Sequence, residues 1–314
     1  GLKNIPEINP PLINASGILS YPEVFLAFEK ADAALGGYVT KSVGPDEKPG
    51  NENPVVVCPE TSAQPVLNSL ALPTQSPSDW EADLGETNLS HSKLIVSVYG
   101  GTPDDFAKMA QRMTPFADVI EVNLGCPNKM PGEATLMESI GQKPELSGEV
   151  IQKIRQVTEL PVIAKLSPNS DYLEVAAACM DAGADGLGCG NTLGPGLALD
   201  IETRAAILAG TTGGISGPAL KPVNLRLTYD CYARFGCPII GYGGIETWRD
   251  VIEYALAGAC IFGIGTAFLG KSTSEAATLT KEIWSGVLAY LDGAPLSSLV
   301  GGAHRNEERE PARA

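Results

Sequence analysis

Short apolar runs rich in valine and isoleucine recur along the chain, and stretches of helical periodicity separate most of them. This alternation is typical of parallel strands joined by crossover helices. Strands are predicted at 11–16, 36–42, 93–100, 118–124, 161–167, 184–191, 238–244 and 259–266. Helices are expected near 22–31, 103–115, 145–159, 171–182, 222–235, 246–257 and 273–292. Eight strands close a barrel, so the pattern predicts an α/β protein with the (β/α)8 TIM-barrel fold.

Two connections between the predicted strands are too long to be simple turns. Residues 50–90 are rich in Pro, Asn and Ser, and residues 192–221 are rich in Gly, Thr and Pro. Long loops in a compact domain are usually lids or binding loops, so both are expected at the C-terminal face of the barrel. No domain boundary is indicated. We expect one barrel domain over residues 1–300 and a polar, disordered tail over residues 301–314.

Composition narrows the possible partners and the compartment. The 22 Lys and Arg residues against 37 Asp and Glu give a net charge of −15. This charge argues against nucleic acid, because phosphate backbones are bound largely by clustered Lys and Arg. No apolar run approaches the roughly 18–20 residues that span a bilayer, and the N-terminus lacks a signal-peptide pattern. The expectation is a cytoplasmic protein without a membrane segment.

In a barrel of this kind, chemistry lies at the carboxyl ends of the strands. Small and polar residues at the predicted strand ends are Ala15, Ser16, Gly17, Lys41, Ser42, Ser97, Asn123, Lys165, Asn191, Thr192, Gly243, Gly244, Gly265 and Thr266. A lysine on an apolar strand is expensive to bury alone, so Lys41 and Lys165 are expected to face an anionic or carbonyl-rich ligand. The alternative is a structural ion pair with a neighbouring acid. The glycines that end the last two strands favour a phosphate-bearing ligand.

Cys126 follows the strand at 118–124 and lies in a Gly/Pro/Asn loop, between Asn123 and Asn128. Most of the seven cysteines lie in apolar surroundings, where cysteine acts as a small hydrophobe. No C-x-x-C pair occurs, so no metal site is expected. A thiol with an ordinary pKa of about 8.5 can act as a base at neutral pH once its thiolate is favoured. Neither histidine lies at a strand end, so a Cys–His nucleophile pair is not indicated.

Several short motifs lie at or near these strand ends: "NASG", "VTKS", "IAKLSPN", "GGISGPALKP", "IIGYGGIET" and "GIGTA". Together with "LNSLALP" and "EVNLGCPN", they resemble in order the motifs of the dihydroorotate dehydrogenases. In that family the segment that matches "LNSLALP" usually reads N-S-[IM]-G-L-[PQ], and the one that matches "EVNLGCPN" usually reads N-[LI]-S-C-P-N. The resemblance covers residues 1–292. It implies an FMN-containing (β/α)8 barrel that oxidises dihydroorotate to orotate in pyrimidine synthesis.

The resemblance also implies a role for each matching residue. Cys126 is similar to the base that removes the C5 proton of the substrate while a hydride leaves C6 for flavin N5. The pyrimidine ring and its carboxylate would contact Lys41, Asn68, Asn123, Asn128, Asn191 and Thr192. Lys165 is similar to a lysine beside flavin N1 and O2. The flavin and its ribityl phosphate would contact Ala15, Ser16, Gly17, Lys41, Ser42, Ser97, Asn123, Lys165, Gly217, Gly243, Gly244, Gly265 and Thr266.

Within the family, the cysteine base and the lack of an amphipathic N-terminal extension point to the soluble class 1. The segment "DIETRAAILAGTTGGISGPALKPVNLR" resembles the 1B form more than the fumarate-using 1A form. Members of 1B pass electrons to a separate subunit with FAD and a 2Fe–2S cluster, and then to NAD. The resemblance therefore implies a homodimer, or a heterotetramer once that subunit joins.

Two residues depart from the usual motifs. Gly125 stands where a serine usually precedes the cysteine, which removes a hydroxyl next to the proposed base. Ala71 stands where a glycine is usual, a conservative change unless the position has positive φ.

Rival functions remain open at the level of sequence. "NLGCP" is also similar to the motif of tRNA-dihydrouridine synthases, but the net charge of −15 does not suit RNA. A dihydropyrimidine dehydrogenase-type substrate fits a similar loop. From other classes come a flavin-free, phosphate-binding aldolase in which Lys165 forms a Schiff base, and a non-catalytic binding module. The polar residues at the strand ends count against the binding module.

Overall fold

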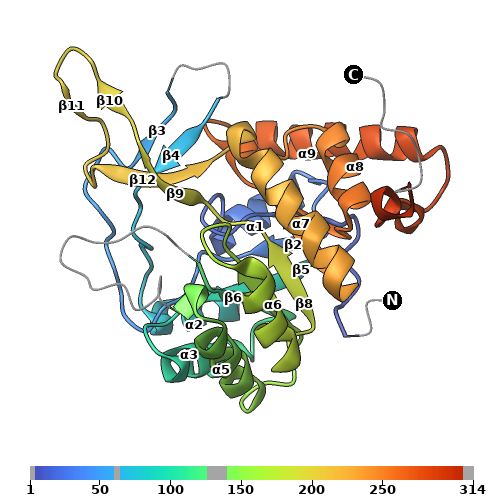
Figure 1. Ribbon diagram of the computed structural model, residues 1–314, viewed down its shortest axis with the longest axis horizontal. Helices are drawn as coiled ribbons and strands as arrows, with labels where there is room; N and C mark the ends of the chain where they lie inside the picture. Colours follow the sequence, from blue (N-terminus) through green and yellow to red (C-terminus); the bar gives the residue numbers. More distant parts are fainter. Residues whose placement is uncertain (1–3, 60–63, 126–139, 307–314) are drawn as a thin grey trace.

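The computed structural model describes residues 4–59, 64–125 and 140–306. Eight parallel strands form a closed barrel in the order β1-β14-β13-β8-β7-β6-β5-β2 (Figure 1). They are β1 (Leu12–Asn14), β2 (Gly37–Val39), β5 (Lys93–Val98), β6 (Val119–Asn123), β7 (Val162–Leu166), β8 (Gly186–Cys189), β13 (Ile239–Tyr242) and β14 (Ile261–Ile264). Each lies inside one of the eight predicted runs, so the predicted TIM-barrel fold is confirmed.

Helices surround the barrel at the positions that the periodicity predicts. They are α1 (Pro22–Lys30), α3 (Pro103–Met113), α5 (Pro144–Arg155), α6 (Tyr172–Asp181), α7 (Lys221–Phe235), α8 (Trp248–Ala257) and α9 (Thr273–Leu291). Helix α3 illustrates the local signals: Thr102 and Asp105 form a reciprocal capping box, and Pro103 occupies the first turn. Its buried face repeats at helical spacing through Phe106, Met109, Ala110 and Met113. No helix in the described ranges is long and apolar enough to cross a membrane.

The barrel interior is apolar toward the amino ends of the strands. One cluster contains Ile13, Val39, Ile95, Val119, Ile163, Ile240 and Ile261, which come from seven barrel strands. Ile5 and Ile8, which precede β1, join this cluster and pack near Gly186 and Gly37, the first residues of β8 and β2. The N-terminal segment therefore plugs this end of the barrel.

The two long connections carry structure that the sequence pattern did not reveal. They contribute a four-stranded antiparallel sheet in the order β3-β4-β12-β9 and a hairpin of β10 and β11 (Figure 1). The strands of the sheet are β3 (Val56–Val57), β4 (Val66–Asn68), β9 (Leu193–Leu197) and β12 (Thr212–Ser216). The hairpin pairs β10 (Leu199–Asp200) with β11 (Ala205–Ala206). The first connection also contains helix α2 (Pro77–Glu86), whose buried apolar side chains beyond Pro77 are only Trp80 and Leu84. With so few apolar positions, the sequence of α2 shows little helical periodicity.

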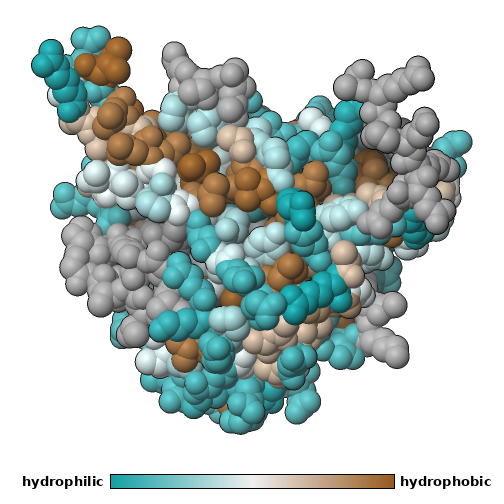
Figure 2. Space-filling view, in the orientation of Figure 1, coloured by the Kyte–Doolittle hydropathy of each residue, from teal (hydrophilic) through white to brown (hydrophobic). Residues whose placement is uncertain are grey.

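Apolar surface gathers over the small sheet and its hairpin, as Figure 2 shows. Leu197, Leu199 and Ile201 are all exposed there, Ile201 to 84%. Contiguous apolar surface of this kind is typical of an interaction site.

The tail prediction was wrong at its boundary. Residues 302–306, expected to be disordered, form the 3-10 helix η4 (Gly302–Asn306). The ring of His304 stacks on Tyr229 with centroids 3.8 Å apart, and its Nε2 lies 3.1 Å from the carbonyl oxygen of Ala257. A polar segment is thus held by aromatic stacking and a hydrogen bond, which hydrophobic periodicity does not report. Residues 307–314 lie outside the described residues.

Candidate active site

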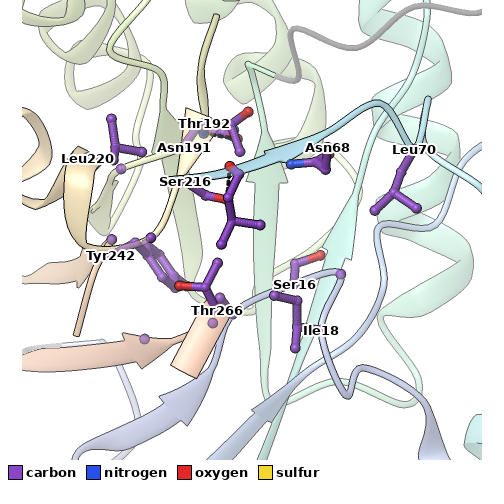
Figure 3. Close-up of a pocket in the computed structure, with 18 of the residues that line it drawn as sticks. Ser16, Ile18, Asn68, Leu70, Asn191, Thr192, Ser216, Leu220, Tyr242 and Thr266 are labelled. Carbon is purple, nitrogen blue, oxygen red and sulfur yellow. Dashed lines mark hydrogen bonds between the residues drawn. The ribbon is translucent and has the colours of Figure 1, made fainter. Parts of the chain in front are cut away.

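A cavity of about 350 Å³ opens at the carboxyl ends of the barrel strands, with the small sheet along one side (Figure 3). It lies among nearly all the described residues that the sequence predicted: Ala15, Ser16, Gly17, Lys41, Ser42, Asn68, Asn123, Lys165, Asn191, Thr192, Gly217, Gly243, Gly244, Gly265 and Thr266. Ser97 lies one contact behind, bonded to Ser42. Cys126 and Asn128 lie outside the described residues.

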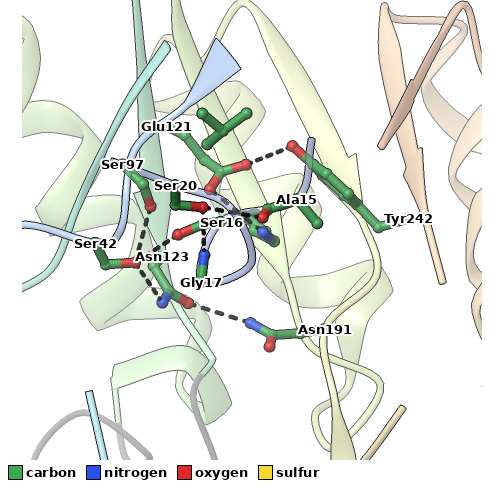
Figure 4. A network of polar contacts seen from close by, with 12 residues as sticks. Ala15, Ser16, Gly17, Ser20, Ser42, Ser97, Glu121, Asn123, Asn191 and Tyr242 are labelled. Atoms are coloured by element: carbon green, nitrogen blue, oxygen red, sulfur yellow. Dashed lines mark hydrogen bonds and ion pairs between the residues drawn. The ribbon is translucent and has the colours of Figure 1, made fainter. Parts of the chain in front are cut away.

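A chain of polar side chains connects five strand ends on one side of the cavity (Figure 4). Asn191 donates to Asn123 Oδ1 at 3.2 Å, and Asn123 donates from Nδ2 to Ser42 Oγ at 3.2 Å. Ser42 Oγ lies 3.0 Å from Ser97 Oγ and 3.3 Å from Ser16 Oγ. These hydrogen bonds fix the orientation of the two asparagine amides. The polar network therefore presents oriented donors and acceptors toward a ligand.

Asn14 holds the first strand end and was not predicted as a site residue. It is fully buried, donates to the carbonyl of Val39 at 2.9 Å, and accepts from the amide of the same residue at 2.7 Å. It also donates to Ser20 Oγ, which in turn accepts from the amide of Gly17. The loop 15–20 is therefore fastened to β2. The "NASG" motif contained this signal, since an asparagine on an apolar strand needs partners.

Asn169, which follows β7, plays a similar part outside the cavity lining and was also missed. Its Nδ2 donates to the carbonyl of Thr192 at 2.9 Å, and its Oδ1 accepts from the amide of Gly194 at 3.0 Å. The segment that follows β8 is thereby held over the cavity. The "SPN" part of "IAKLSPN" carries this residue.

The opposite end of the cavity is lined by glycines. Gly217, Gly243 and Gly244 have φ of 83°, 114° and 65°, which favour glycine. A Cβ at Gly244 would lie 2.8 Å from Lys221 Cβ and 2.9 Å from the carbonyl oxygen of Gly217, so no side chain fits there. Lys221 itself is held by Asp250 and Glu253, each at 2.6 Å. Backbone amides at the ends of β13 and β14 are therefore the groups suited to a phosphate.

Lys165 forms a buried ion pair of the kind that the structural alternative predicted, and it also lines the cavity. Its Nζ lies 3.3 Å from Glu121 Oε1, and Glu121 is fully buried. Tyr242 donates its hydroxyl to Glu121 Oε2 at 2.6 Å. Lys165 still lines the cavity, so its ammonium is paired with an acid on one side and available to a ligand on the other.

The structure gives a reason for glycine at position 125. An added Cβ would lie 2.3 Å from Ser167 Cβ, closer than real Cβ contacts allow. The amide of Gly125 donates to Asn123 Oδ1 at 3.3 Å. The departure from the usual serine therefore goes with a close approach of the chain to Ser167 at the end of β7.

Replacement of the usual glycine by Ala71 is not conservative, because the backbone at this position has a positive φ. Its φ is +58°, and the next residue, Leu72, has φ of +56°. A left-handed conformation costs a residue with a Cβ roughly 1–2 kcal/mol. The glycine usual at this position thus has a physical reason, and Ala71 is strained.

Most other described cysteines are structural, as their apolar surroundings predicted. Cys179, Cys189, Cys231 and Cys237 are buried. Burial raises the pKa of Cys179 to about 12 and, with the nearby Cys231, that of Cys237 to about 12. Cys179 and Cys237 therefore stay protonated at neutral pH, as suits a structural role.

Fold and cavity together define a class of protein: a (β/α)8 barrel with a cavity at the carboxyl ends of its strands, where asparagines and lysines line one part and glycines another. The model of the dihydroorotate dehydrogenase family matches residues 4–286. The chain is 40% identical over 292 residues to "Dihydroorotate dehydrogenase B (NAD(+)), catalytic subunit" of Pyrococcus abyssi, covering 92% of each chain. Relatives with the same name come from Methanocaldococcus jannaschii, 35% identical over 306 residues and 95% of each chain, and from Pelobacter propionicus, 36% identical over 303 residues, 94% of this chain and 95% of the relative.

The chain therefore belongs to the dihydroorotate dehydrogenase family. The predicted likeness to the 1B catalytic subunits is confirmed by these relatives.

Proposed function

We propose that this chain is a catalytic subunit that oxidises (S)-dihydroorotate to orotate with bound FMN in pyrimidine biosynthesis. The observation that carries the proposal is one cavity, lined by oriented asparagines, two lysines and a glycine cradle, in a chain of this family. A non-catalytic barrel has no need of so many polar groups at its strand ends.

The size of the cavity and the residues that line it support FMN as the cofactor. Its volume lies within the usual range for cofactor sites, roughly 300–1,000 Å³. Gly217, Gly243, Gly244, Gly265 and Thr266 would hold the ribityl phosphate. Ala15, Ser16, Gly17, Lys41, Ser42, Asn123 and Lys165 would surround the flavin ring, with Ser97 behind Ser42. When bound, the flavin supplies the acceptor for a hydride from C6 of the substrate.

The substrate ring would lie against the asparagines. Dihydroorotate carries ring N–H donors, carbonyl acceptors and a carboxylate, and an asparagine amide offers both a donor and an acceptor. Asn68, Asn123, Asn128, Asn191 and Thr192 would bind these groups, and Lys41 would offset the carboxylate charge. Asn123 is the residue through which this set and the flavin set meet, since it bonds both Asn191 and Ser42.

Cys126 is proposed as the base that removes the C5 proton, on the strength of the "EVNLGCPN" motif. The residue before the motif's cysteine, Gly125, follows β6 and approaches β7. A positioned general base typically contributes about 10²–10⁴-fold to a proton-transfer rate.

We further propose that electrons leave through a partner subunit carrying FAD and a 2Fe–2S cluster, with NAD as the final acceptor in the cytoplasm. The names of the relatives, catalytic subunits of NAD-linked enzymes, support this route. The exposed apolar strip at Leu197, Leu199 and Ile201 is the kind of surface that a second subunit, or a second copy in a homodimer, would cover. A heterotetramer of two chains of each kind is the assembly proposed.

Anaerobic reduction followed by reoxidation tests the function and its acceptor. The purified protein, loaded with FMN, should lose its flavin colour when dihydroorotate is added, and NAD should restore the colour only after the partner subunit is added. Rapid reoxidation by fumarate alone would move the chain to the 1A form. A protein that neither binds FMN nor is bleached by dihydroorotate would overturn the proposal.

A further inference from the structure

Three side chains from different strands meet inside the barrel, at the boundary between its apolar interior and the cavity. They are Glu121 from β6, Lys165 from β7 and Tyr242 from β13, and Figure 4 shows the contact between Glu121 and Tyr242. Lys165 and Tyr242 line the cavity, whereas Glu121 is fully buried behind them. A carboxylate with no exposure needs a partner for each oxygen, and this one has them.

Tyr242 contacts both members of the ion pair. Its hydroxyl donates to Glu121 Oε2 at 2.6 Å, and the Nζ of Lys165 lies 4.2 Å from its ring centroid. The second contact is in the range of a cation–π interaction. One oxygen of Glu121 is thereby held by the tyrosine, the other is left for Lys165, and the flexible lysine is confined between a carboxylate and a ring face.

The tyrosine is itself fixed by neighbours that leave it little freedom. A Cβ at Gly263, on the adjacent strand β14, would lie 2.1 Å from two carbons of the Tyr242 ring, so a glycine is needed there. The hydroxyl of Tyr254 lies 2.9 Å from the carbonyl oxygens of both Tyr242 and Gly243, which share its single proton. Burial, and next the charge of Glu121, raise the pKa of Tyr242 well above its ordinary value. It therefore stays a neutral donor throughout the neutral pH range.

We propose that Tyr242 is a positioning residue that, through Glu121, sets how much of the Lys165 charge reaches the ligand ring in the cavity. This inference rests on the proposed function, in which that ring is the flavin of FMN. The hydrogen bond from Tyr242 draws the negative charge of Glu121 toward Oε2, the oxygen that does not face Lys165. The carboxylate then offsets less of the Lys165 charge, and a ring that gains negative charge on reduction is held more tightly.

Two substitutions should shift the preference for reduced over oxidised FMN in opposite directions. Tyr242→Phe keeps the ring but removes the donor, so Glu121 offsets Lys165 more fully, and the preference should fall on the order of threefold. Glu121→Gln removes the offsetting charge, so the preference should rise on the order of tenfold. For a two-electron couple, tenfold corresponds to roughly 30 mV in the midpoint potential.

The experiment is a redox titration of bound FMN in the wild-type protein and both variants, with the dissociation constant of oxidised FMN measured on each apoprotein. Tyr172→Phe is the matched control. That tyrosine also donates to a carboxylate, Asp230 at 2.8 Å, but from helix α6 to helix α7 outside the cavity lining. Its removal should leave the midpoint potential unchanged. A thermal melt of each apoprotein reports whether a variant has folded.

Shifts of opposite sign in Tyr242→Phe and Glu121→Gln, with none in Tyr172→Phe, are the expected result. An unchanged midpoint potential in Tyr242→Phe, or shifts of the same sign in both cavity variants, would overturn the inference. Failure of the proposed function looks different, because the wild-type apoprotein would then not bind FMN at all. A tyrosine that only supports the fold would lower the melting temperature without moving the potential.

Discussion

The two halves of the barrel interior are built on the same strands but have opposite chemistry. Toward the amino ends, isoleucines and valines pack with almost no exposure and are plugged by the N-terminal segment. Toward the carboxyl ends, the next inward-facing positions on these strands carry Ser97, Glu121, Asn123 and Lys165. Strand β6 passes from one half to the other through Val119, Glu121 and Asn123, which alternate with residues facing the helices. Val119 and Glu121 are two residues apart, so at about 3.3 Å per residue the apolar packing and the polar site lie roughly 7 Å apart along the strand.

The largest effect is expected where the polar half supplies the chemistry. Cys126→Ala should retain FMN but slow flavin reduction by dihydroorotate about 10²–10⁴-fold at neutral pH, because the proposed base is lost. Cys126→Ser should be slow at neutral pH and recover as the pH rises, because a hydroxyl is harder to deprotonate than a thiol. Stopped-flow absorbance of the flavin measures both, and near-normal reduction in Cys126→Ala would refute the assigned base.

Paired substitutions in the two halves test whether stability and chemistry are separate. Ile163→Ala leaves a void in the apolar half and should lower the free energy of unfolding by about 2–5 kcal/mol, while the folded protein still binds FMN. Asn123→Ala should cost only about 1 kcal/mol, since water in the cavity can replace its hydrogen bonds. It should nevertheless lose most dihydroorotate-dependent reduction. Urea unfolding and flavin reduction, measured on both variants, check the separation; equal losses of stability would contradict it.

A smaller effect is expected at the close contact between Gly125 and Ser167. Gly125→Ala should lower the free energy of unfolding by about 1–3 kcal/mol through overpacking. Adding Ser167→Gly removes the Cβ that the new methyl meets and should restore much of the loss, a coupling that a double-mutant cycle measures. Adding Ser167→Ala keeps that Cβ and serves as the control. Equal rescue by both second substitutions would show that the contact is not the cause.

The smallest effect concerns the strained backbone at Ala71, beside the cavity-lining Leu70 and Leu72. Ala71→Gly should raise the free energy of unfolding by about 0.5–1 kcal/mol, because strain is relieved at φ of +58° while the unfolded chain gains some entropy. Ala178→Gly in helix α6 is the control and should destabilise by about 1 kcal/mol. Thermal melts of both variants give the signs, and a destabilised Ala71→Gly would contradict the strain.

The sequence predicted the barrel and many of the cavity residues because strand ends in this fold converge on one face, whereas Asn68 and Gly217 came from the resemblance to the family. Glu121 could also have been found, since it is an acid in the middle of "VIEVN" with the same parity as Asn123. Tyr242 could not, because an aromatic residue in "IIGYGG" is equally typical of an apolar strand. The small sheet and α2 have too few apolar positions to show a period. The clash at Gly125 and the positive φ at Ala71 depend on tertiary contacts and backbone angles that no local pattern encodes.

The most direct test of the account is an anaerobic titration of the FMN-loaded protein with dihydroorotate, followed by flavin absorbance and by orotate formation. One orotate formed for each flavin bleached is the predicted result, with dihydrouracil, which lacks the carboxylate that Lys41 is proposed to meet, leaving the flavin oxidised. Bleaching by dihydrouracil but not by dihydroorotate would contradict the proposed substrate.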